Sequence, residues 1–171
     1  MAGQFSISRV LLWLFVVVLG VVIGGGLYET LVVMPLWSAG PPESVLAYHR
    51  HNVANPRFAL DPGGRFWMLF TPTLGLLAAA NLFSGLKARD GHRRWRVAAS
   101  GIVLAVIIFT FAWFVPNIIR LTGGGVAGLA DERIAGLTNW WVLLNWVRAA
   151  LYIAALLAGL RALTIPPATK A

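Results

Sequence analysis

Cysteine is absent from the 171 residues of this sequence. Its absence excludes disulfides, thiolate nucleophiles, CxxC redox centres and iron–sulfur clusters. Charged residues are also scarce, at 12% of the chain, whereas apolar residues make up 58%. Soluble domains carry about 25% charged residues. The composition therefore indicates an integral membrane protein.

Acidic residues are few, because six Asp and Glu stand against 14 Lys and Arg, for a formal net charge of +8. In a soluble protein this basic excess would suggest a nucleic-acid partner. Here the basic residues lie between apolar runs, which is the pattern of the positive-inside rule. We therefore expect contact with a lipid bilayer and no nucleic-acid partner.

Apolar runs long enough to cross a bilayer, which takes about 20 helical residues, occur four times. They cover about residues 10–36, 66–86, 97–119 and 138–163. The first run is too long for a secretory signal, so we interpret it as a retained span. The sequence predicts an all-α fold, in which residues 1–171 form a single membrane domain built as a four-helix bundle.

Basic residues are distributed unevenly between the two sides of this predicted bundle. Eight lie in the termini and in the loop between the second and third spans, and five lie in the other two loops. The positive-inside rule therefore places both termini in the cytoplasm. In each outer loop we expect a short interfacial helix, one from Glu43 to Asn55 before Pro56 and one beginning at Asp131.

The last apolar run carries Arg148, an always-charged group, near its middle. Trp141, Asn145, Arg148 and Tyr152 follow one another at spacings of four, three and four residues, so they share one face of a helix. A charge in hydrocarbon is costly. We therefore expect these four residues, the Arg148 stripe, to face protein rather than lipid.

Glu29 is the only carboxylate inside a predicted span. At 1.5 Å per residue it lies roughly 12 Å from the outer end of the first span, and Arg148 lies roughly 13 Å from the outer start of the fourth. Two opposite charges at one depth are expected to pair. Two readings remain open: a structural clasp that fixes helix register, or a polar pocket that opens toward the outer face.

His49 and His51 lie in the expected loop helix with one residue between them, so their rings point to different sides. The dense cluster of Cys, His and acids that marks a metal site is lacking, and we expect no metal. A neutral imidazole at the mouth of a pocket would suit a general base. Histidines at the headgroup level without a chemical role are an equal alternative.

Tryptophans near the ends of the predicted spans are typical of interfacial belts. They are Trp37, Trp67, Trp95, Trp140 and Trp141. The glycine-rich segment 24–26 favours close helix packing. It is not a phosphate loop, because no Gly-Lys-Ser/Thr follows it.

Three segments, Val32-Val33-Met34-Pro35, Phe114-Val115-Pro116-Asn117 and Leu144-Asn145-Trp146-Val147-Arg148, resemble the anthrone-oxygenase-like family of small four-span membrane proteins. The likeness extends over most of the chain. Fungal members of that family are associated with cofactor-independent oxidation of anthrones to anthraquinones by dioxygen. The resemblance therefore implies an oxidoreductase that acts on a lipophilic phenol or anthrone without a cofactor.

Combining the resemblance with the residues predicts a site. Glu29, His49 or His51 would remove a proton from the substrate, and Arg148 would stabilise the enolate oxygen as its charge develops. The expected substrate-binding residues are Tyr28, Asn52, Trp113, Asn117, Trp141, Asn145 and Tyr152.

A second reading belongs to another class of function. Glycine-rich and tryptophan-rich faces also suit a non-catalytic accessory or scaffolding subunit, packed against a membrane-protein partner or as a homo-oligomer. A transporter is the third possibility, because a chain with four spans would have to oligomerise to form a path for a transported substrate. For a bacterial protein the expected location is the cytoplasmic membrane.

Overall fold

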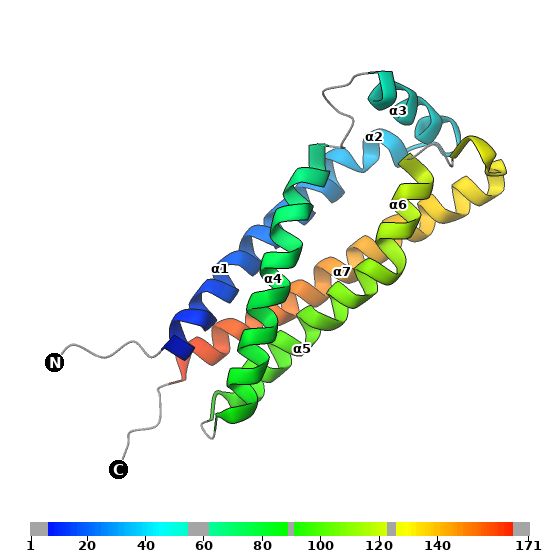
Figure 1. The fold of residues 1–171 in the computed structure, drawn as a ribbon. Helices are drawn as coiled ribbons and strands as arrows, with labels where there is room; N and C mark the ends of the chain where they lie inside the picture. The colour runs from blue at the N-terminus through cyan, green and yellow to red at the C-terminus, as the bar shows by residue number, and fades with distance from the viewer. Residues whose placement is uncertain (1–6, 55–61, 89–90, 123–125, 166–171) are drawn as a thin grey trace, which may run out of the picture. The chain divides into compact units, whose positions relative to one another are not determined.

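The computed structural model describes residues 7–54, 62–88, 91–122 and 126–165, and within them it is helical almost throughout (Figure 1). The α-helices are α1 (Ile7–Tyr28), α2 (Pro35–Ser38), α3 (Glu43–Ala54), α4 (Pro62–Lys87), α5 (Arg93–Phe109), α6 (Val115–Thr122) and α7 (Asp131–Thr164). Two π-helical turns, η1 (Glu29–Val33) and η3 (Thr110–Phe114), and one 3₁₀ turn, η4 (Val126–Gly128), complete the order of elements.

Within the described residues, four helical segments are long and apolar enough to cross a membrane. They are Ile7–Ser38, Gly63–Lys87, Arg93–Leu121 and Asp131–Thr164. The predicted all-α fold and its four membrane-crossing helices are therefore confirmed. Each helix extends past its apolar run at both ends, because backbone hydrogen bonding continues through the headgroup layers on either side of the hydrocarbon core.

The connection between the first and second spans differs from the connection between the third and fourth. In the first, α3 forms as expected, packs against α2 and α6, and buries Val45 to 2% exposure. In the second, Asp131 does not begin a separate short helix. It begins α7 itself, because no proline interrupts the segment between Asp131 and the apolar run, so the helix continues into the span.

Both π-helical turns precede a proline. In η1 the N–H of Met34 donates to the carbonyl of Glu29 at 2.7 Å, five residues back, and Pro35 follows. In η3 the N–H of Val115 donates to the carbonyl of Thr110, again five residues back, and Pro116 follows. A proline ring clashes with the carbonyl four residues earlier and offers no N–H. A wider turn just before it accommodates both defects, and such turns are frequent at functional sites.

The chain divides into two compact units, and each of the four spans contributes to both. Unit 1 comprises Met1–Ile23, Leu69–Ile107 and Ala150–Ala171. Unit 2 comprises Gly24–Met68 and Ile108–Ala149. Unit 2 therefore contains both π-helical turns, the short helices α2, α3 and α6, and the 3₁₀ turn η4.

Burial along α7 confirms that the Arg148 stripe faces protein. Trp141, Asn145 and Tyr152 are 4%, 3% and 7% exposed. On other faces of the same helix Leu143 and Leu151 are 53% and 41% exposed, as suits residues that contact lipid tails. The spacing of polar residues thus distinguishes the interior side of this helix from its lipid side.

Candidate functional site

Glu29 and Arg148 both contact the side chain of Trp67 on α4. The indole Nε1 of Trp67 donates a hydrogen bond to Glu29 Oε2 at 2.6 Å. The guanidinium of Arg148 lies over the Trp67 ring, with Cζ 5.5 Å from the ring centroid, and over the Phe114 ring at 4.4 Å. Both distances allow a cation–π attraction, which strengthens away from water. All four spans therefore supply a side chain to this place in unit 2.

Asn145 fixes the position of Arg148. Its Oδ1 accepts a hydrogen bond from Arg148 Nη2 at 2.6 Å, while its Nδ2 donates to the Trp141 carbonyl at 3.2 Å. Because Asn145 is anchored to its own helix, it holds the guanidinium in one orientation. We refer to Glu29, Trp67, Phe114, Asn145 and Arg148 as the Arg148 cluster.

The same arrangement recurs on the third span. Asn117 donates to the Trp113 carbonyl at 2.8 Å and accepts from Arg120 at 3.5 Å. This copy is looser, and Arg120 is exposed. The spacing of Trp, Asn and Arg therefore gives the same local hydrogen bonds on both helices. The copy on α7 differs in its shorter Asn–Arg distance and in the lower exposure of its arginine.

An aromatic wall stands beside the Arg148 cluster. Trp141 packs against Phe114, Trp113 and Trp37 with ring centroids 4.7, 6.0 and 6.1 Å away. Phe109 stacks on Trp113 at 6.1 Å. Trp141 Nε1 is buried and has no hydrogen-bond partner among the described residues. A buried N–H without an acceptor is energetically costly.

The interpretation of all terminal tryptophans as interfacial belts is wrong for two of them. Trp37 and Trp141 are 6% and 4% exposed, because their rings fill the space between α2, η3 and α7. Trp140 is 58% exposed and fits the expected belt. The expectation of an interfacial belt also did not include the hydrogen bond from Trp67 Nε1 to Glu29 Oε2.

Close packing at Gly25 brings the Trp67 segment against the first span. A Cβ added at Gly25 would come within 2.5 Å of the Phe66 ring, and one at Gly26 within 3.7 Å of the Trp67 ring. At Gly24, by contrast, nothing lies within 4 Å. The expected role of the glycine triplet in helix packing is thus confirmed at Gly25, which leaves room for the ring of a neighbouring helix.

The histidines lie on α3 in different surroundings. His49 is half-buried, and its Nδ1 is buried without a hydrogen-bond partner among the described residues. His51 is exposed. Asn52 lies on the same helix, but its side chain is outside the described part of the structure. In that part no three His, Cys, Asp or Glu side chains lie close enough to hold a metal ion together.

Two of the tyrosines considered for substrate binding lie apart from the cluster in different ways. Tyr28 is 63% exposed at the end of α1. Tyr152 is buried but belongs to unit 1.

Sequence reasoning missed a second polar cluster, which lies in unit 1. Arg96 is only 1% exposed and donates to the Ser8 carbonyl at 2.8 Å, to Ser8 Oγ, and to Asn81 Oδ1 at 2.6 Å. Asn81 donates in turn to the Leu77 carbonyl at 2.9 Å and the Leu11 carbonyl at 3.0 Å. We refer to Ser8, Asn81 and Arg96 as the Arg96 cluster.

Arg96 is one of five Lys and Arg residues within the ten residues 87–96. Such a concentration of basic residues is a signal of membrane topology. The available hint was Asn81, the one amide within the second span. A buried amide needs partners. Nothing in the spacing of the two residues, however, identifies Arg96 as that partner.

The fold and the buried polar clusters define a class: a four-span helical membrane protein whose interior carries hydrogen-bonded arginines. The family comparison is more specific. The model of the family described as anthrone oxygenase matches residues 65–158, more than half of the chain, and the protein belongs to that family. The matched region includes Trp67, Phe114, Asn145 and Arg148. No curated protein and no solved structure matches the chain.

Proposed function

We propose that this protein is a cofactor-independent oxygenase that converts a lipophilic anthrone-type phenol to the corresponding quinone. The observation that carries the proposal is the position of Arg148, whose guanidinium lies against two aromatic rings while Glu29 is bound to one of them. A cation and a carboxylate in one aromatic environment suit a flat substrate that must lose a proton. Membership of the anthrone oxygenase family supports this choice of substrate class.

The roles follow from charge. Glu29 accepts the proton, because its carboxylate is hydrogen-bonded to Trp67, the same side chain whose ring lies under the Arg148 guanidinium. Arg148 and the unpartnered Trp141 Nε1 stabilise the enolate oxygen, whose negative charge grows as the proton leaves. The neighbouring rings hold the flat substrate by stacking. The site thus makes an electron-rich anion from a neutral anthrone.

The reaction balances without a further reagent. Loss of a proton from the substrate CH₂ group gives an anthranolate anion, which passes one electron to dioxygen. The resulting radical and superoxide combine in a new carbon–oxygen bond, and protonation gives a hydroperoxide. Loss of the remaining hydrogen on that carbon with cleavage of the O–O bond releases water and leaves the quinone carbonyl. One dioxygen is consumed, and one water is formed per quinone.

The test uses Arg148→Ala in membranes that contain the full-length protein, with anthrone oxidation followed by quinone absorbance. We expect at least a 100-fold loss of rate, which is the scale for removing one preorganised donor to a developing oxyanion. Arg120→Ala is the matched control, since Arg120 occupies the equivalent position of the exposed copy on the third span. Its rate should stay within twofold of the unmodified protein.

Glu29→Gln should lose activity as Arg148→Ala does, whereas His51→Gln should retain it. Full activity of the Arg148→Ala protein would refute the proposed mechanism. Absence of any oxidation by the unmodified protein, with a stoichiometric membrane protein co-purifying in mild detergent, would favour the scaffolding subunit instead. In a bacterial cell the proposed location is the cytoplasmic membrane.

A further inference from the structure

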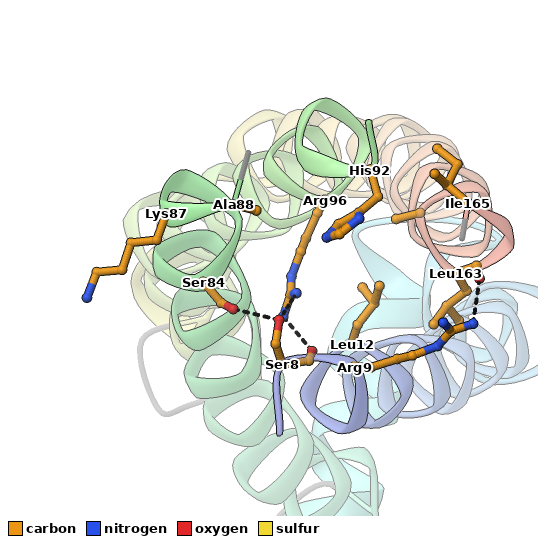
Figure 2. A pocket seen from close by; sticks show the side chains of 11 residues that line it. Ser8, Arg9, Leu12, Ser84, Lys87, Ala88, His92, Arg96, Leu163 and Ile165 are labelled. Carbon is orange, nitrogen blue, oxygen red and sulfur yellow. Dashed lines mark hydrogen bonds between the residues drawn. The ribbon is translucent and has the colours of Figure 1, made fainter. Parts of the chain in front are cut away.

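Unit 1 contains a cavity of about 290 Å³ at the ends of its helices. Ser8 and Arg9 stand at the start of α1, Lys87 at the end of α4, and His92 immediately before α5. The end of α7 closes the remaining side, where Arg9 Nη2 donates to the Leu163 carbonyl at 3.3 Å. Figure 2 shows His92 and Arg96 side by side, with Arg9 reaching toward Leu163.

The lining of this cavity is positively charged. Arg9, Lys87 and Arg96 contribute three cations, and the His92 side chain also lines the cavity. No acidic residue lines the cavity within the described part of the chain. The cavity therefore favours an anion.

The buried Arg96 distinguishes this cavity from a group of charges on the protein surface. It is 1% exposed, and its three hydrogen-bond acceptors, two on Ser8 and one on Asn81, are all neutral. Its Nε is buried and has no partner among the described residues. A guanidinium that is taken out of water without a negative partner is poorly compensated. An anion in the cavity would supply the missing charge.

Hydroxyl groups extend the donor set. Ser8 Oγ and Ser84 Oγ lie 2.9 Å apart at the cavity, and one of the two hydroxyls donates to the other. Arginine forks and small hydroxyls match the oxygens of a phosphate group, which can accept several hydrogen bonds at once. At helix ends beside a membrane surface, phosphate is available in lipid headgroups and in free solution.

We propose that this cavity binds a phosphate group, carried either by an anionic phospholipid or by inorganic phosphate. Arg96 forms the fixed inner wall, held by Ser8 and Asn81. Arg9 and Lys87 contribute charge at the rim, which is where an incoming phosphate would first be attracted. This site shares no residue with the Arg148 cluster, so a test of phosphate binding does not depend on the outcome for the oxygenase proposal.

The test titrates the full-length protein, purified in a neutral detergent, by calorimetry. Dihexanoyl phosphatidylglycerol and inorganic phosphate are the two probes, and dihexanoyl phosphatidylcholine is the uncharged comparison. The variant is the double substitution Arg9→Gln with Lys87→Gln, which leaves the buried Arg96 in place. The control is Arg93→Gln with Arg94→Gln, which removes the same charge from exposed residues that do not line the cavity.

We expect saturable binding of an anionic probe that weakens at least tenfold in the Arg9 and Lys87 variant and stays within twofold in the control. Binding of phosphatidylglycerol alone would assign the site to a lipid headgroup. Binding of inorganic phosphate would assign it to the free ion. No binding, equal binding of phosphatidylcholine, or equal weakening in both variants would overturn the proposal. Thermal unfolding of each variant establishes that it is folded.

Discussion

Arg96 and Arg148 are both held by polar and aromatic neighbours within the protein, but by different kinds of contact. Arg96 in unit 1 is surrounded in its own plane by a backbone carbonyl, a hydroxyl and an amide oxygen. Arg148 in unit 2 donates to one amide oxygen and lies over two aromatic rings. In both cases an asparagine that is anchored to its own helix supplies an oxygen.

This difference separates a structural arginine from one that suits chemistry. Hydrogen bonds in the guanidinium plane fix Arg96 to α1 and α4, so removing it breaks contacts between helices. Aromatic faces attract a cation without using its donors. Arg148 thus lies in an aromatic environment that would also suit a flat aromatic ligand. The predictions below test this difference between Arg96 and Arg148.

The largest effect on stability is expected for Arg96→Leu. It leaves the Ser8 carbonyl and Asn81 Oδ1 without their donor and removes three hydrogen bonds between helices, each contributing about 0.6 to 2 kcal/mol in membrane proteins. We expect a loss of about 3 kcal/mol, measured as a lower unfolding temperature in detergent. Arg148→Leu should lower that temperature clearly less. Equal shifts in the two variants would end the distinction between the clusters.

An intermediate effect is expected for Gly25→Ala. The added methyl would meet the Phe66 ring at 2.5 Å, and such overpacking costs about 1 to 3 kcal/mol. It should also displace the adjacent Trp67 and lower the rate of oxidation. Gly24→Ala is the matched control, because nothing lies within 4 Å there and alanine favours a helix. The prediction is contradicted if unfolding temperatures of the two variants agree.

The smallest effect on stability is expected for Trp67→Phe. This change keeps an aromatic face for Arg148 but removes the N–H that binds Glu29. We expect about a tenfold lower oxidation rate, since a hydrogen bond to a charged group contributes about 1.5 to 3 kcal/mol and part of it is replaced. The unfolding temperature should change little. Retention of the full rate would show that the position of Glu29 does not depend on this bond.

Much of the fold could be predicted because hydropathy and charge are local properties. A run of apolar residues must form a helix in a bilayer, where every backbone group needs an internal partner. The interior face of α7 could be predicted as well, since Arg148 and its neighbours share a helical period. Helix ends were less predictable at Asp131, where no residue stops the helix before the span.

The partners of the buried arginines could not be predicted in the same way. Arg96 stands in a basic run that is normally exposed, and its burial depends on Ser8 and Asn81 from two other spans. Trp67 stands at a span end, where a belt is the usual expectation. Its contact with Glu29 depends on how closely two helices approach, and that distance is a property of the packed bundle.

The π-helical turn at Glu29–Val33 makes the length of this segment as important as its composition. Each residue advances a helix by about 100°, and an extra residue in one turn resets the angular frame of everything that follows. The turn closed by the bond from Met34 to Glu29 takes up one residue more than an α-turn, and a single deletion between these two residues would close it as an ordinary α-turn. The extra residue, and not only the residue types, thus keeps Glu29 in a widened turn before Pro35.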